Sequence, residues 1–235
     1  MTVMTHRPDT SASDDTTAPP LSETGTEKAL AMATDAPPPH SDLEEIAVFG
    51  DDLGEITDTL ALEFELLTAL VWAPDSVTRD VITALIGDAG TRERTHGRPD
   101  TAIPLSHTLF LSTGHTILFT TIVAMIDEGM PVTPTLLLAR LRETGDHRTV
   151  AALLPDLAAP RGHTPLPGGI DTPHLAAALV DAWYRRGYTA LLARMTHATT
   201  TEPTDTLAGH WSALTTHAAA AERRWLTIRD TLASL

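Results

Sequence analysis

The fold of this chain is decided by residues 207–232, which read LAGHWSALTTHAAAAERRWLTIRDTL. Apolar residues recur there at alternating spacings of four and three, and the charged residues occupy the positions between them. This is the a/d pattern of a helix that packs lengthwise against another helix. The seam consists of Leu207, Trp211, Leu214, Ala218, Ala221, Trp225, Ile228 and Leu232.

A second long helix is predicted immediately before this one. It starts at Thr172-Pro173, because threonine is a good cap and proline suits the first helical position, and its apolar face continues to about Thr196. Two long helices joined across a break at 198–204 indicate an αα-hairpin. Two interpretations of the seam stay open: it packs only on the preceding helix, or the hairpin also forms a subunit interface.

The residues before the hairpin also follow a helical period, and no convincing period-two stretch appears. A helix capped by Asp75 or Ser76 is expected to reach Ile86, and Thr133-Pro134 repeats the threonine–proline start. The fold class predicted is all-α: a compact helical bundle over 55–160 followed by the hairpin over 161–235. The other helices are predicted near 56–72, 114–128 and 134–144, with a long loop at 87–105 and a Pro/Gly stretch at 155–169.

The first part of the chain has a different composition. Residues 1–55 hold twelve Asp or Glu and only two basic residues, together with six of the 17 prolines. A segment with so little apolar content cannot offset the entropy cost of ordering, so residues 1–54 are expected to form a disordered acidic tail. The net charge of −15 also argues against direct binding of duplex DNA.

Several kinds of chemistry are excluded or disfavoured by residue type. There are no cysteines, which removes thiolate catalysis and Cys-ligated zinc, and the single lysine, Lys28, follows no glycine-rich phosphate loop. His210 and His217 are seven residues apart, too far along a helix to share an ion. The acidic pairs Glu63/Glu65 and Asp127/Glu128 are expected to be solvated. We therefore expect no enzyme activity, no cofactor and no metal; a histidine-based metal hydrolase is the enzymatic alternative.

The remaining candidates are interaction surfaces. Trp183-Tyr184-Arg185-Arg186 places cations beside large aromatic side chains, a combination that is enriched at interaction hot spots. Arg92, Arg94 and Arg98 of the long loop are a weaker candidate for contact with nucleic acid. The predicted interface combines the aromatic–arginine cluster with the hairpin seam. Its residues are Trp183, Tyr184, Arg185, Arg186, Leu207, Trp211, Leu214, Trp225 and Ile228.

The order of these features resembles the N-terminal helical domain of DnaB-type replicative helicases. The resemblance is carried by LEFELLTAL at 62–70, by GHTILF at 114–119, by EGMPVT at 128–133 and by LRETG at 141–145. It continues with LAAALV at 175–180 and Tyr184-Arg185-Arg186, similar to the family's long helix before its linker. It spans roughly residues 56–235, although the loop at 87–105 is longer than the family's connection.

The resemblance implies a non-catalytic role, because the helicase motor and its phosphate loop have no counterpart here. In that family the domain self-associates and provides contacts to primase or loader proteins. We therefore expect a homo-oligomer, or a protein that binds the replicative helicase or primase. With no apolar run long enough for a membrane span, a cytoplasmic location is expected. The alternative is a self-assembling helical scaffold unrelated to replication.

Overall fold

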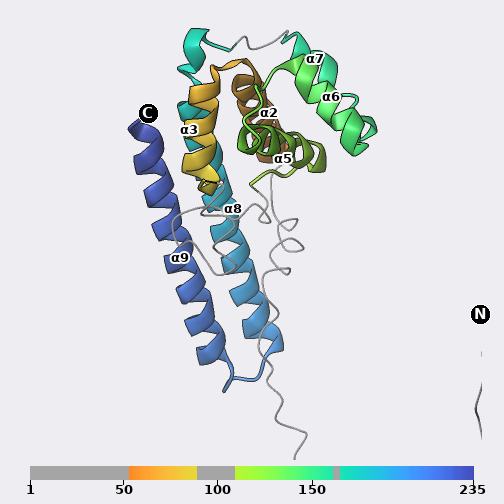
Figure 1. The fold of residues 1–235 in the computed structure, drawn as a ribbon. Helices are drawn as coiled ribbons and strands as arrows, with labels where there is room; N and C mark the ends of the chain where they lie inside the picture. The colour runs from red at the N-terminus through yellow and green to blue at the C-terminus, as the bar shows by residue number, and fades with distance from the viewer. Residues whose placement is uncertain (1–52, 89–108, 161–164) are drawn as a thin grey trace, which may run out of the picture. The chain divides into compact units, whose positions relative to one another are not determined.

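The computed structural model describes residues 53–88, 109–160 and 165–235, all of which belong to one compact unit, Pro39–Leu235. The predicted acidic tail at 1–54 and the arginine loop lie almost wholly outside these residues. Within them every element is helical, which confirms the all-α class (Figure 1). The elements are α2 (Leu53–Trp72), α3 (Asp75–Ile86), α5 (Thr113–Asp127), α6 (Pro134–Thr144), η1 (Asp146–Arg148), α7 (Leu154–Ala158), η2 (Pro167–Gly169), α8 (Thr172–Thr201) and α9 (Leu207–Ala233).

The predicted start of α6 is confirmed, whereas two other predicted helix starts are wrong. The Thr133 hydroxyl accepts a hydrogen bond from the backbone N–H of Leu136, and Pro134 opens the helix. Helix α3 begins one residue earlier than a cap at Asp75 would allow, and its capping position is Pro74. In α8 the capping position is Asp171, whose carboxylate instead accepts from the N–H of Leu166.

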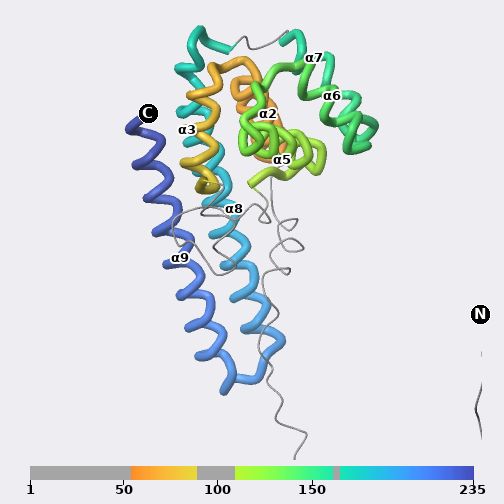
Figure 2. Tube along the Cα trace, in the orientation of Figure 1, coloured from red at the N-terminus to blue at the C-terminus, as the bar shows by residue number. Residues whose placement is uncertain are grey.

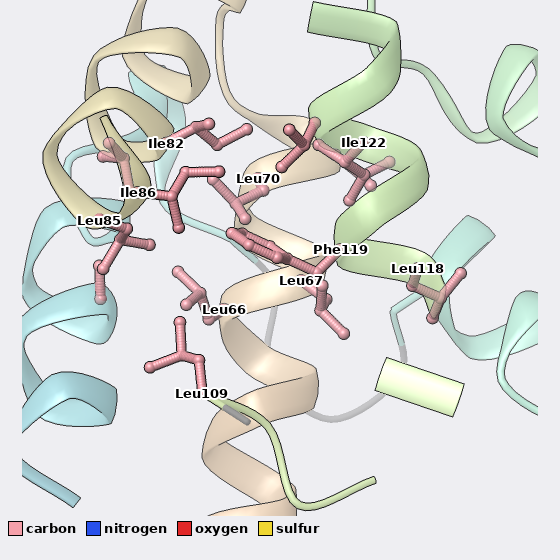
Figure 3. Close-up of a cluster of buried hydrophobic side chains, with 14 of the residues drawn as sticks. Leu66, Leu67, Leu70, Ile82, Leu85, Ile86, Leu109, Leu118, Phe119 and Ile122 are labelled. Carbon is pink, nitrogen blue, oxygen red and sulfur yellow. The ribbon is translucent and has the colours of Figure 1, made fainter. Parts of the chain in front are cut away.

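Helix α2 lies at the centre of the bundle, and its apolar side chains are contacted from both flanking helices (Figure 3). Leu66, Leu67 and Leu70 are completely buried. They pack in one cluster with side chains of α3 and α5 that include Ile82 and Ile122. Burying large aliphatic side chains contributes about 1.5–3 kcal/mol each relative to exposure. This cluster is therefore the main source of stability in the described part of the chain.

Helices α8 and α9 lie side by side and form the predicted hairpin (Figure 2). Both also contact the bundle: α8 packs on α2 and α3, and α9 packs on α3. Ile228 and Leu232 of α9 are buried in the same cluster as Leu179 and Val180 of α8. The bundle and this part of the hairpin thus share one hydrophobic core. The boundary at residue 160 stays a prediction.

The part of the hairpin next to its turn is much less covered. Between residues 191 and 227 only Ala198 is buried. Figure 1 shows this part of α8 and α9 extending beyond α2, α3 and α5. The seam predicted from the sequence therefore has two environments, a core environment near Ile228 and a half-exposed one near Trp211. Among the described residues, no helix combines the length and apolarity that a membrane span requires.

Candidate interaction surface

The aromatic cluster on the hairpin joins α8 to α9. The rings of Tyr184 and Trp225 are stacked, with centroids 5.0 Å apart and planes inclined by 16°. The indole Nε1 of Trp225 donates to Asp181 Oδ1 over 2.7 Å, and the Arg229 guanidinium lies 5.3 Å from the indole centroid. Stacking, a charge-assisted hydrogen bond and a cation–π contact together fix the orientation of the indole.

Burial and nearby charge also change the acidity of this cluster. Burial raises the pKa of Tyr184 above the usual 10.0, and the carboxylate of Glu222 and the neighbouring Tyr188 raise it further. Each of these disfavours the phenolate, because the anion loses solvation or meets like charge. The Tyr184 hydroxyl therefore stays protonated throughout the physiological range.

One face of the hairpin can be traced outward from this stack. Tyr184, Tyr188 and Leu192 are four residues apart, so they follow one side of α8. Trp225 lies about four helical turns after Trp211, which places the two on one side of α9, and Leu226 follows Trp225 at the edge of that side. The two rows meet at the stack of Tyr184 on Trp225. We call this surface the hairpin face. Its residues are Tyr184, Tyr188, Leu192, Trp211, Trp225 and Leu226.

The hairpin face carries several exposed large apolar side chains. Tyr188 is 51% exposed, Leu192 55%, Trp211 54% and Leu226 46%. These are four of the ten exposed large apolar side chains among the described residues, and they lie on two neighbouring helices. Single exposed apolar residues are ordinary, whereas several along the half-exposed part of one hairpin favour a contact surface.

The four residues of the predicted Trp183–Arg186 cluster lie in different environments. Trp183 packs against the core, and Tyr184 stacks on α9. Arg185 is exposed, while Arg186 donates from Nη2 to the carbonyl oxygen of Leu109 over 2.9 Å. Successive helical residues point about 100° apart, so four of them cannot share one surface. Tyr188 and Leu192 complete the face instead, and their positions four and eight residues after Tyr184 are the signal in the sequence.

The predicted seam residues are also placed differently from one another. Ile228 is buried in the core, whereas Leu207 and Leu214 are half-buried. Trp225 is half-buried and held by its contacts to α8, and Trp211 is more than half exposed. Of the predicted seam residues, Trp211 and Trp225 therefore contribute most clearly to the hairpin face.

A buried ionisable pair lies elsewhere, between α2 and α5, and it corrects one prediction. Glu63 was expected to be solvated but is completely buried. Its Oε2 lies 2.7 Å from Nδ1 of His115, which is 4% exposed. The carboxylate also accepts from the backbone N–H groups of Leu111 and Ser112, at 2.5 and 3.3 Å. A carboxylate at a helix N-terminus satisfies donors that the helix itself leaves unpaired.

The segment 109–112 is therefore held from two sides. Arg186 of α8 donates to its first carbonyl, and Glu63 of α2 accepts from its last two N–H groups. The pair and the arginine thus position the entry to α5 relative to α2 and α8.

No group of three or more His, Asp or Glu side chains with the geometry of a metal site occurs within the described ranges. No family model, no curated protein and no solved structure matches this chain.

Proposed function

We propose that this chain is a non-catalytic protein–protein interaction module that associates through the hairpin face. The observation that carries the proposal is the exposure of Tyr188, Leu192 and Trp211 beside a fixed Tyr184–Trp225 stack. Tyrosine and tryptophan are enriched at hot spots, and a fixed ring loses little side-chain entropy on binding. A surface of this kind gains stability when a partner removes it from water.

The first occupant we propose is a second copy of the chain. The face carries charges of both signs: Arg185 lies on the same side of α8 as Tyr188, and Glu222 on the same side of α9 as Leu226. A two-fold axis brings opposite parts of one surface together, so a face with both signs suits self-association. The resemblance to the helicase N-terminal domain adds a second proposed partner, the replicative helicase or primase. A scaffold unrelated to replication is the alternative.

The test is the concentration dependence of mass in solution. Sedimentation of the full chain is compared with a Leu192→Ala, Trp211→Ala double variant and with Leu136→Ala, an exposed leucine of α6, as a matched control. Loss of hot-spot side chains should weaken dimerisation at least about tenfold, while the control dimerises normally. At protein concentrations low enough for the parent to be monomeric, all three should unfold at nearly the same denaturant concentration, because the changed side chains are about half exposed.

Partner choice is decided by a second measurement on the same proteins. Purified helicase and primase from the same genome are each titrated with the full chain and with the double variant. Binding that the double variant loses favours the replication assignment, and self-association alone favours the scaffold. A chain that stays monomeric and binds neither protein overturns the proposal.

A further inference from the structure

Charge is divided unevenly between the parts of this chain. Residues 1–55 carry twelve Asp or Glu against two basic residues, and residues 56–171 carry fourteen against eight arginines. In residues 172–235, which contain the hairpin, six arginines exceed five Asp or Glu. Of these three parts, the hairpin is therefore the one whose charge suits the strongly acidic start of the chain.

One side of α8 faces the bundle, and it continues past the bundle toward the hairpin turn. Arg186 marks this side, because it donates to the carbonyl of Leu109 at the entry to α5. The residues that follow it on this side, at spacings of four, three and four, are Ala190, Ala193 and His197. Arg194 comes directly after Ala193 and lies at the edge of the same side.

The corresponding side of α9 is marked by Ile228, which is buried in the shared core. Arg224 and His217 precede it by four and eleven residues, which are close to whole numbers of helical turns. They therefore continue the bundle side of α9 toward the hairpin turn. We call the two rows together the basic face. Its residues are Arg186, Arg194, His197, His217 and Arg224.

Carboxylates border the basic face, but α8 contributes none to it. The helical residues 183–201 and 207–221 contain no Asp or Glu. Glu222 stands two residues before the arginine of α9, so it lies nearly on the opposite side of that helix. Asp88 follows the end of α3, which packs on both helices. The turn adds two further carboxylates, Glu202 and Asp205. The middle of the face, at Arg194, is thus positive.

The direction of α2 determines where the preceding chain meets the hairpin. Ala73, directly after α2, packs on Gly169, just before α8. Glu63, ten residues earlier, binds the segment before α5 that Arg186 of α8 also contacts. Helix α2 therefore runs opposite to α8, and the end of α2 nearer the hairpin turn is its start, at Leu53.

The segment directly before α2 has a composition that suits the basic face. Residues 42–52 read DLEEIAVFGDD, with five carboxylates, five apolar residues and neither lysine nor arginine. Eleven residues span up to about 36–40 Å when extended. The part of α8 from 187 to 201 is only about 21 Å long at 1.5 Å per residue. The segment can therefore reach along the whole of this part of α8.

We propose that residues 42–52 dock on the basic face of the same chain. Their carboxylates meet half-buried Arg194 and exposed His197, while their apolar side chains cover the alanines of α8. The attraction is a sum of several charge pairs near the surface, and salt screens it. For these eleven residues the proposal replaces the expectation of disorder.

The basic face is separate from the hairpin face. Arg186 is two residues from both Tyr184 and Tyr188, so it lies on nearly the opposite side of α8. Docking of the segment therefore leaves the hairpin face uncovered. The inference does not depend on the proposed function, and either can fail without the other.

The test is paramagnetic relaxation in the full chain, which has no cysteine and so accepts a spin label at one chosen site. Ser41→Cys carries the label beside the segment. At low salt we expect the label to broaden the backbone amide signals of Ala193 and His197 and to leave that of Leu136, on α6, sharp. The broadening should be lost at about 1 M salt, where the Debye length is about 3 Å.

Charge variants separate docking from mere proximity of the label. Arg194→Glu should remove most of the broadening, whereas Arg185→Glu, on a different side of α8, should not. Because Arg194 is half-buried, a second variant changes the segment instead. Glu44→Lys with Glu45→Lys should give the same loss, and combining it with Arg194→Glu should restore the broadening. Denaturant unfolding checks that every variant folds.

Three results would overturn the proposal. Broadening that persists in high salt and in Arg194→Glu means that the label is near the hairpin only because the chain connects them. Equal losses in Arg194→Glu and Arg185→Glu mean that total charge decides, and not this face. Broadening seen only between a spin-labelled chain and an isotope-labelled one assigns the contact to a second copy. The Leu192→Ala, Trp211→Ala variant should keep the parent's pattern, which distinguishes this site from the hairpin face.

Discussion

Glu63 and His115 are separated by 52 positions in the chain, yet their side chains meet inside the bundle with Oε2 2.7 Å from Nδ1. The Glu63 side chain also accepts from the backbone N–H groups of Leu111 and Ser112. One buried side chain of α2 therefore binds three polar groups that belong to α5 and its entry.

Removing this carboxylate should be costly. Glu63→Ala leaves the buried imidazole and two backbone N–H groups without their hydrogen-bond partner, and each buried polar group left unpaired costs about 1–3 kcal/mol. Glu65→Ala, two residues along α2 and only half-buried, is the matched control and should cost far less. The measurement is the free energy of unfolding in urea. Equal losses in the two variants would show that the pair contributes no more than an ordinary surface residue.

The close approach of η2 to α2 predicts a difference between two adjacent glycines. Gly168 and Gly169 have φ values of 75° and 70°, so alanine is strained at either position. Only at Gly169 would the added Cβ also meet Ala73, at 2.6 Å; at Gly168 nothing lies within 4 Å. Gly169→Ala should therefore lose about 1–3 kcal/mol more than Gly168→Ala in denaturant unfolding. Indistinguishable midpoints would mean that the contact relaxes without cost.

The hydrogen bond of Trp225 should be measurable separately from its stacking. Trp225→Phe keeps an aromatic ring near Tyr184 but removes the donor to Asp181, at an expected cost of about 1 kcal/mol. Trp211→Phe, at a ring that is 54% exposed, should stay within about 0.5 kcal/mol of the parent. Thermal or urea unfolding compares the two. A larger loss of stability for Trp211→Phe than for Trp225→Phe would contradict the assignment of Trp225 as the tryptophan that stabilises the hairpin.

The raised pKa of Tyr184 predicts how the hairpin responds to alkaline pH. The folded state holds the phenol proton more tightly than the unfolded chain, so this contribution to stability is complete below pH 10.0 and is lost as pH rises through the folded pKa. The chain has two tyrosines, so Tyr188→Phe leaves Tyr184 as the sole phenol for ultraviolet titration. Adding Glu222→Gln should lower the pKa of Tyr184 by removing like charge. An unchanged or higher value would contradict the assigned cause.

Local chemistry was sufficient to predict much of the architecture. The 3.6-residue period gave the long hairpin and the bundle helices, and Thr133-Pro134 gave the start of α6. These features depend on residues within a few positions of one another, where backbone geometry fixes which side chains are neighbours. The predicted caps at Asp75 and Thr172 were wrong, because Pro74 and Asp171 occupy the capping positions.

The candidate surfaces depended on the tertiary structure. A heptad pattern identifies one side of α9, but the bundle covers that side at Ile228 and leaves it exposed at Trp211. Likewise, the contact of Gly169 in η2 with Ala73 at the end of α2 joins segments far apart in the sequence.

The sequence by itself thus determined the helical class, the hairpin and the absence of cysteine chemistry, because periodicity and composition act over short distances. The tertiary structure alone decided that Glu63 is buried against His115 and that Tyr188, Leu192 and Trp211 stay exposed. The physical reason is that burial is set by what packs against a side chain, and those neighbours come from distant segments of the chain.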